Sequence, residues 1–180
     1  MISSTPSALV FQNVDALYSM TAHEGVIREA IHQLKYENLP EVARTLGHHL
    51  ANALPWSVTA VVPVPLHAQR LQDRGYNQAE LIGRTVAKSL SIPLYAQYLL
   101  RQKDTRSQVG LSAGQRRDNV QAAFAVNSQA GLELAGPVLL VDDVCTTGAT
   151  LAAAAEALKE GGAQTVYAAT ISLAISADTK

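Results

Sequence analysis

The order of apolar and polar positions along the chain predicts helices that alternate with strands. Apolar residues at helical spacing predict helices over 23–36 and 42–54, and Glu24 favours the start of the first. An edge strand or hairpin arm is expected over 9–18. The remaining elements are predicted in this order: strand 58–65, helix 78–90, strand 92–100, helix 112–117, strand 122–126, strand 138–141, helix 149–160 and strand 165–173. Such alternation predicts parallel βαβ units, which bind ligands at the carboxyl ends of their strands.

The most informative stretch begins with four apolar residues, 138–141, and continues with Asp142, Asp143 and a turn rich in hydroxyls. The apolar run predicts a buried parallel strand, and the helix just past Gly148 offers its first backbone N–H groups to an anion. Three threonines add hydroxyl donors: Thr146, Thr147 and Thr150. The two carboxylates would repel a phosphate but suit sugar hydroxyls. The stretch therefore predicts a ribose 5-phosphate site, and the alternative is that the carboxylates only cap the helix.

A polar segment follows the strand over 58–65, whose end is marked by two prolines. It is expected to be a loop, and it carries three basic side chains: His67, Arg70 and Arg74. Asn77 with Glu80 three residues later forms a capping box, which predicts that the next helix starts at Gln78. The loop brings cations to the carboxyl edge of the sheet, unless Arg74 pairs with a neighbouring carboxylate at the surface.

A second polar segment, 101–112, follows the strand over 92–100. Nine of the fourteen Lys and Arg residues lie between Arg70 and Arg117, so the middle of the chain is where anions are expected to bind. Ser112 and Gln115 form another capping box and open a short helix. Segments of this kind are usually solvated connectors, but they also act as lids over active sites, and we expect a lid here.

Composition narrows the class of protein. The 180 residues, 48% of them hydrophobic, predict a single domain, 1–180, with an N-terminal strand and helices over 1–55 and an α/β core over 56–174. The only cysteine, Cys145, excludes an internal disulfide and a cysteine-rich zinc site within this chain. His48 and His49 face different directions on a helix, so they are expected to be surface residues. Without a membrane span or signal-peptide pattern, a cytoplasmic protein is expected.

The segment from 138 to 150 resembles the phosphoribosyl pyrophosphate (PRPP) signature of the type I phosphoribosyltransferases: four hydrophobic residues, Asp-Asp, then Thr-Thr-Gly-x-Thr. Cys145 is the loose position, because the family more often has an aliphatic or aromatic residue there. The resemblance implies that family's α/β fold, a mostly parallel Rossmann-like sheet flanked by helices, with a flexible loop and a small N-terminal helical hood. A P-loop is excluded because no Lys follows the glycine, and a dinucleotide fingerprint because the turn has one glycine.

Three further stretches resemble the competence protein F (ComF) family, across nearly the whole chain from about residue 20: 25–36, 62–67 with 74–78, and 103–108 with 111–112 and 117–119. Members commonly begin with a four-cysteine zinc-binding segment, which is not found in this sequence. The family is linked to natural transformation and DNA uptake, and it is called amidophosphoribosyltransferase-like because of its PRPP site. The resemblance does not identify the acceptor.

The resemblance also implies roles for individual residues. Asp142 and Asp143 would hold the ribose hydroxyls and face the positive charge at the anomeric carbon, and Arg74 would stabilise the departing pyrophosphate, so these three are the predicted catalytic residues. The predicted PRPP contacts are Val144, Cys145, Thr146, Thr147, Gly148, Ala149, Thr150, Pro65, Leu66, His67, Arg70, Lys103 and Arg106. Mg2+ is the predicted cofactor, carried by PRPP with Asp142 and Asp143 as candidate protein contacts, and no resident metal is expected.

Two classes of function remain open at this point. The first is a PRPP-dependent phosphoribosyltransferase, which transfers the phosphoribosyl group to an unidentified acceptor or to water. The second is a module that senses PRPP or nucleotides, or assists single-stranded DNA, without turnover, because Tyr76, Tyr95 and Tyr98 lie among basic residues. The partners left open are single-stranded DNA, competence proteins and a second copy of the chain in a homodimer, and no membrane is expected.

Overall fold

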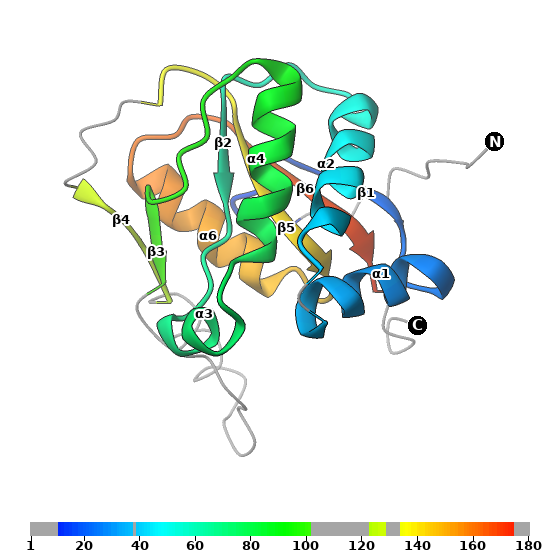
Figure 1. Cartoon of the computed structure of the whole chain (residues 1–180). Coiled ribbons are helices and arrows are strands. Elements are labelled where there is room, and N and C mark those ends of the chain that lie inside the picture. The colour runs from blue at the N-terminus through cyan, green and yellow to red at the C-terminus, as the bar shows by residue number, and fades with distance from the viewer. Residues whose placement is uncertain (1–10, 38, 102–122, 129–133, 175–180) are drawn as a thin grey trace, which may run out of the picture.

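The computed structural model describes residues 11–37, 39–101, 123–128 and 134–174. Lys103, Arg106, most of the predicted lid and the predicted helix over 112–117 lie outside the described residues, so they stay predictions. The described residues form a central parallel sheet with helices on both faces, and a separate two-stranded sheet lies beside it (Figure 1).

The central sheet has four parallel strands in the order β1-β6-β5-β2. Their bounds are β1 (Ala16–Ala22), β2 (Ala60–Pro63), β5 (Val138–Cys145) and β6 (Val166–Leu173). Residues 138–141 of β5 are fully buried, as expected for a strand that helices cover on both sides. The predicted α/β class with a mostly parallel sheet is confirmed.

Helices cover the two faces of this sheet unequally (Figure 1). Three of them lie on one face: α1 (Gly25–Tyr36), α2 (Glu41–Ala53) and α4 (Gln78–Leu90). The other face is covered by α6 (Ala149–Glu160). Successive residues of β5 serve the two cores in turn, since Leu139 and Val141 pack with α1, α2 and α4, whereas Val138 and Leu140 pack with α6.

The start of α4, near the carboxyl edge of the sheet, follows from local sequence. The side chain of Asn77 accepts a hydrogen bond from the Ala79 N–H at 3.1 Å, so α4 begins at Gln78 as the capping box predicts. The bond goes to the second residue of the helix, whereas a capping box places it at the third. The amide of Asn77 also donates to the Val64 carbonyl at 2.9 Å, which fixes the segment after β2 to the start of α4.

Two predictions about the segments after β2 are wrong. The expected loop with three basic side chains contains a helix, α3 (Ala68–Arg74), which has no buried residue and therefore no apolar stripe that periodicity could detect. The strand expected over 92–100 is not continuous, and only its last two residues, Leu99 and Leu100, lie in a strand. Pro93 has no N–H, only Leu94 bridges Val61 of β2, and the chain then leaves the sheet.

The chain beyond this bridge forms the small antiparallel sheet, in which β3 (Leu99–Arg101) pairs with β4 (Phe124–Val126). The strand expected over 9–18 also differs, because β1 begins at Ala16, although it lies at the edge of the sheet as predicted. The strand arrows of the central sheet run toward the end of the molecule where α3 and the end of α1 lie (Figure 1).

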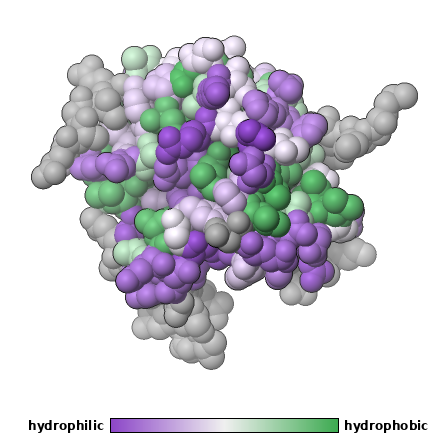
Figure 2. Space-filling view, viewed as in Figure 1, coloured by the Kyte–Doolittle hydropathy of each residue, from purple (hydrophilic) through white to green (hydrophobic). Residues whose placement is uncertain are grey.

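The surface on the α1, α2 and α4 side mixes hydrophilic and hydrophobic side chains, and hydrophobic ones gather toward α1 (Figure 2). Val26 of α1 is 83% exposed and Tyr36, at the end of the same helix, is 68% exposed. Among the described residues, no helix combines the length and the apolar character that crossing a bilayer requires.

Candidate functional site

The carboxyl end of β5 carries two adjacent carboxylates, Asp142 and Asp143. Because successive side chains of a strand point to opposite faces, the two reach different neighbours. Asp143 is 7% exposed, and its Oδ2 lies 2.9 Å from the Nζ of Lys35 in the last turn of α1. Arg101, at the end of β3, is close enough for its charge to favour the ionised form of Asp142. Lys35 thus pairs with Asp143, and the charges of both Lys35 and Arg101 act on Asp142.

The pKa of Asp142 is raised from its ordinary value of 3.8 to about 7. Burial is the main cause, and the neighbouring Asp143 carboxylate adds to it. The Asp143 N–H, which donates to Asp142 Oδ1 at 2.8 Å, and the charges of Lys35 and Arg101 oppose the rise. Burial therefore favours the protonated form of Asp142, and a cation or hydroxyl donors placed against it would favour the ionised form.

The turn after β5 leads directly into α6. Gly148 adopts a φ of 78°, which favours glycine, and Thr146 and Thr147 are exposed. The Ala149 N–H donates to Thr147 Oγ1 at 3.4 Å. The ring of Phe11 packs so closely on Gly148 that a Cβ there would overlap it. Hydroxyls and the first N–H groups of a twelve-residue helix therefore adjoin the carboxylate pair.

Cys145 lies in this turn but does not offer its side chain to a ligand. The thiol is 2% exposed, and burial, with the nearby Asp142 charge, raises its pKa to about 11. Its carbonyl accepts a hydrogen bond from the Ala174 N–H at 2.8 Å. Cys145 is a buried thiol and not a nucleophile.

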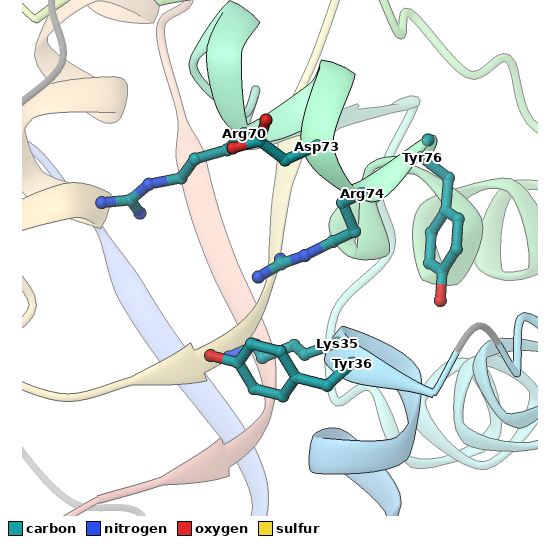
Figure 3. Close-up of a pocket in the computed structure, with 7 residues that line it drawn as sticks. Lys35, Tyr36, Arg70, Asp73, Arg74 and Tyr76 are labelled. Atoms are coloured by element: carbon teal, nitrogen blue, oxygen red, sulfur yellow. The ribbon is translucent and has the colours of Figure 1, made fainter.

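A cavity of about 870 Å³ opens beside the end of α1 and α3 (Figure 3). It is lined by Lys35, Tyr36, Arg70, Asp73, Arg74, Gly75 and Tyr76. Figure 3 shows Arg74 reaching from α3 across to the side of Lys35 and Tyr36, with its guanidinium carbon 5.5 Å from the centre of the Tyr36 ring. Three cations against one carboxylate make this cavity suitable for an anion.

The surface ion pair weighed as an alternative for Arg74 is not formed. Arg74 Nη1 donates to Gln78 Oε1 at 2.7 Å. Glu80 pairs with Arg84 at 2.7 Å, and Asp73 accepts from the side chain of Gln69 at 2.9 Å. Arg74 is thus held toward the cavity by an uncharged partner, and neither Asp73 nor Glu80 pairs with it.

His67 begins α3, and its side chain has a structural task. Its Nδ1 accepts from the Gln69 N–H at 3.3 Å, which makes it the N-cap of α3. The preceding Pro65 and Leu66 are half-buried, and the Val64 N–H donates to the Val141 carbonyl at 2.9 Å. The predicted contact segment is therefore fixed between β5 and α3, at the same edge as the carboxylates.

The family model for the phosphoribosyl transferase domain matches residues 42–178 of this chain. The chain belongs to the phosphoribosyltransferase family. Competence protein F of Haemophilus influenzae is 35% identical over 144 residues, covering 76% of this chain and 63% of that protein. The DNA utilization protein YhgH of Salmonella typhi is 32% identical over 160 residues, covering 83% of this chain and 68% of that protein. The resemblance to competence protein F is thereby confirmed.

Among solved structures, the glutamine PRPP amidotransferase from Bacillus subtilis, complexed with ADP and GMP, matches with a TM-score of 0.53. It is 20% identical, and the match covers 77% of this chain and 30% of that chain. This likeness shows the type I phosphoribosyltransferase fold. The chain spans less than two thirds of the length of competence protein F.

Sequence reasoning missed three residues of this candidate site: Lys35, Tyr36 and Arg101. Lys35 and Tyr36 end the stretch 25–36, which the resemblance to competence protein F singled out without giving it a role. Arg101 lies at the end of β3 in the small sheet, and its charge acts on Asp142 from there. Lys103 and Arg106 lie outside the described residues.

The tyrosines considered as stacking platforms are largely engaged in packing. Tyr98 is 3% exposed, and its hydroxyl donates to the Gly161 carbonyl at 3.3 Å. Tyr95 lies against it, with ring centres 6.3 Å apart. Tyr76 donates to the Leu34 carbonyl at 2.6 Å. A base could not stack on the buried ring of Tyr98, so only part of the proposed platform is available.

The donor set at the end of β5 fits Mg2+. Adjacent carboxylates with oxygen ligands supplied by a phosphorylated substrate are the environment that Mg2+ prefers. Within the described residues, the one group of at least three potential ligands with metal spacing lies elsewhere, on the exposed side of α1, and comprises Glu29, His32 and Glu37. A metal at the site would therefore depend on oxygens of the substrate.

Proposed function

We propose that the protein binds PRPP with Mg2+ and transfers its phosphoribosyl group to an acceptor, with release of pyrophosphate. The observation that supports this proposal is that Lys35 both pairs with Asp143 and lines the cationic cavity, while the turn before α6 directly follows the two carboxylates. In PRPP the ribose lies between a 5-phosphate and a pyrophosphate. The turn would bind the 5-phosphate, the carboxylates the ribose and the cationic cavity the pyrophosphate. The proposal includes a cytoplasmic location.

In the proposed reaction, a lone pair of the acceptor forms a bond to the anomeric carbon and the carbon–oxygen bond to pyrophosphate breaks. Pyrophosphate leaves with the electron pair of that bond, and the acceptor loses its proton to solvent. Asp142 and Asp143 accept from the ribose hydroxyls and face the positive charge of the oxocarbenium-like state. Arg70 and Arg74 bind the pyrophosphate oxygens, for which guanidinium forks are suited. Bound Mg2+, held through Asp142 and Asp143, would neutralise pyrophosphate charge.

A role in DNA uptake is the second part of the proposal. It is supported by the names of two relatives, a competence protein and a DNA utilization protein. The rival class is a module that binds PRPP or a nucleotide without turnover. The raised pKa of Asp142 and the pairing of Asp143 with Lys35 are compatible with both classes, so turnover itself must be measured.

Binding and turnover are tested separately. Calorimetry with PRPP and Mg2+ compares the full chain with Asp142→Asn/Asp143→Asn, and Glu41→Gln on the outer surface of α2 is the matched control. The double variant should lose at least about tenfold in affinity, because each charged hydrogen bond contributes ~1.5–3 kcal/mol, and the control should not. Equal affinities for all three proteins would contradict the PRPP site.

Release of pyrophosphate from PRPP is then followed with a panel of bases and amines and with water alone. Turnover that disappears in the double variant supports the enzyme. Tight binding without release under every condition supports the binding module instead.

A further inference from the structure

We propose that Lys35 is the leaving-group residue of this site, with its ammonium bound both to Asp143 and to the pyrophosphate next to the bond that breaks. This inference rests on the proposed function and adds to it a residue from the N-terminal helix. Its basis is the place of Lys35 in the fold, at the junction of the carboxylate pair and the cationic cavity.

The geometry places one ammonium in contact with two parts of the site. Lys35 Nζ lies 2.9 Å from Asp143 Oδ2, and the two side chains are 24% and 10% exposed. The same side chain lines the cavity with Arg70 and Arg74 (Figure 3). An ammonium has three N–H donors, and the bond to Asp143 uses one of them. The others can serve a ligand in the cavity.

The position of Lys35 is fixed by bonds to the preceding residue. The Leu34 carbonyl accepts from the Tyr76 hydroxyl at 2.6 Å and from Gln78 Nε2 at 3.5 Å. Gln78 in turn accepts from Arg74 at 2.7 Å. These bonds join the last turn of α1 to α3 and α4, so Lys35 and Arg74 keep a fixed relation to each other.

The chemistry of PRPP indicates what Lys35 does at this position. The ribose and the pyrophosphate are joined by the bond between the anomeric carbon and an oxygen. With the ribose hydroxyls at Asp143 and the pyrophosphate at Arg70 and Arg74, a group that contacts both regions lies beside that bond. As the bond breaks, its electron pair moves onto the pyrophosphate oxygen. A cation there is bound more strongly in the transition state than in the ground state, so Lys35 should raise kcat.

The rival explanation is a structural ion pair that only anchors α1 to the sheet. In that case, loss of Lys35 would lower the melting temperature and weaken every ligand of the site to the same extent. A leaving-group residue instead acts on ligands that carry pyrophosphate. Ribose 5-phosphate, which lacks that group, separates the two explanations.

The test compares Lys35→Met, Lys35→Arg and the control Lys88→Met, an exposed lysine in the last turn of α4. Affinities are measured for PRPP with Mg2+, pyrophosphate with Mg2+ and ribose 5-phosphate, together with the melting temperature. We expect Lys35→Met to bind PRPP and pyrophosphate at least about tenfold more weakly, since a charged hydrogen bond is lost, and ribose 5-phosphate within about threefold. Lys35→Arg should recover part of the loss, and Lys88→Met should match the unchanged protein.

Equal losses for all three ligands, or unchanged PRPP affinity in Lys35→Met, would overturn the role of Lys35 while the proposed function stands. If the unchanged protein binds no PRPP, both the proposed function and this inference are wrong. Where an acceptor supports turnover, Lys35→Met should lower kcat, and a change confined to KM would overturn the leaving-group role.

Discussion

The hydroxyl of Tyr76 donates to the Leu34 carbonyl across 2.6 Å, which joins the segment before α4 to the last turn of α1. Burial raises the pKa of Tyr76, so the phenol remains protonated and able to donate. The other side chain that donates to the Leu34 carbonyl among the described residues is Gln78, through Nε2 at the longer distance of 3.5 Å. The hydrogen bond therefore helps to hold the last turn of α1 in place beside the site.

Tyr76→Phe should lower the free energy of unfolding by ~1–2 kcal/mol, because a partly buried carbonyl loses its main donor. The measurement is urea unfolding. The control is Tyr167→Phe, because the Tyr167 ring lies at the start of β6 and stacks on Trp56. Amide exchange should also accelerate in the last turn of α1. If the two variants lose equal stability and α1 exchanges at its original rate, the bond does not anchor the helix.

Asp142→Asn should stabilise the protein in the absence of ligand. The folded-state pKa of about 7 lies above the ordinary 3.8, so the favourable contribution of Asp142 is complete below pH 3.8 and is lost as the pH rises through about 7. Asparagine carries no charge and can still accept from the Asp143 N–H. The gain should be on the order of 3 kcal/mol at pH 8 and vanish near pH 4.

Melting curves between pH 4 and pH 8 measure this gain. A stability difference between the two proteins that does not change with pH would show that Asp142 ionises normally. With Mg2+ and PRPP present, the order should reverse, since ligand binding stabilises the folded state and the variant binds more weakly.

Asp15, which directly precedes β1, makes stability depend on pH with the opposite sign. Burial disfavours its charge, but the Val166 N–H at 2.7 Å and Lys159 at 3.0 Å outweigh burial and lower the pKa of Asp15. Its contribution is therefore present above the ordinary 3.8 and is lost as the pH falls through the lowered value. Asp15→Asn should cost about 1 kcal/mol or less at pH 7, since the carboxylate is partly exposed.

The check is the melting temperature of both proteins from pH 7 to pH 2.5. Their difference should shrink as the pH falls below about 4. A difference that stays constant over this range would contradict the stabilising role of the ionised carboxylate.

Gly148→Ala should disturb both stability and ligand binding. A side chain there must adopt a φ of 78° and would overlap the ring of Phe11. We expect a loss of ~2–4 kcal/mol from backbone strain and the clash together. The double variant Phe11→Ala/Gly148→Ala removes the clash and should be damaged less than the sum of the two single variants, as measured by urea unfolding. Additive losses would mean that the ring and the turn do not interact.

The parts of the fold that local sequence specifies were predictable. The apolar run 138–141 and the glycine after the threonines define β5 and the start of α6, and Asn77 defines the start of α4. α3 escaped detection because a seven-residue helix without buried residues leaves no periodic pattern. The run over 92–100 has the composition of a strand, but a proline and the departure of the chain limit it to one bridge.

The part of the candidate site that could be predicted from the motif is the segment from Asp142 to the threonines after it. Asp142, Asp143 and the threonines are consecutive in sequence, and their chemistry follows from their order. Lys35 reaches Asp143 from a helix more than a hundred residues earlier, through a contact that depends on how α1 crosses the end of the sheet. Such a contact depends on the tertiary structure, and no local sequence pattern predicts it.

The pairing of β1 with β6 affects when this site can form during synthesis. Ala16 lies beside Tyr167 and Ala22 beside Leu173, so the strand that leads into α1 has its partner about 150 residues later. On the ribosome, β1 and the helix after it must wait until β6 has emerged. Lys35 therefore reaches Asp143 only after nearly all of the domain has been translated, and a nascent chain stalled before β6 would carry the complete Asp-Asp-threonine motif without its N-terminal cation.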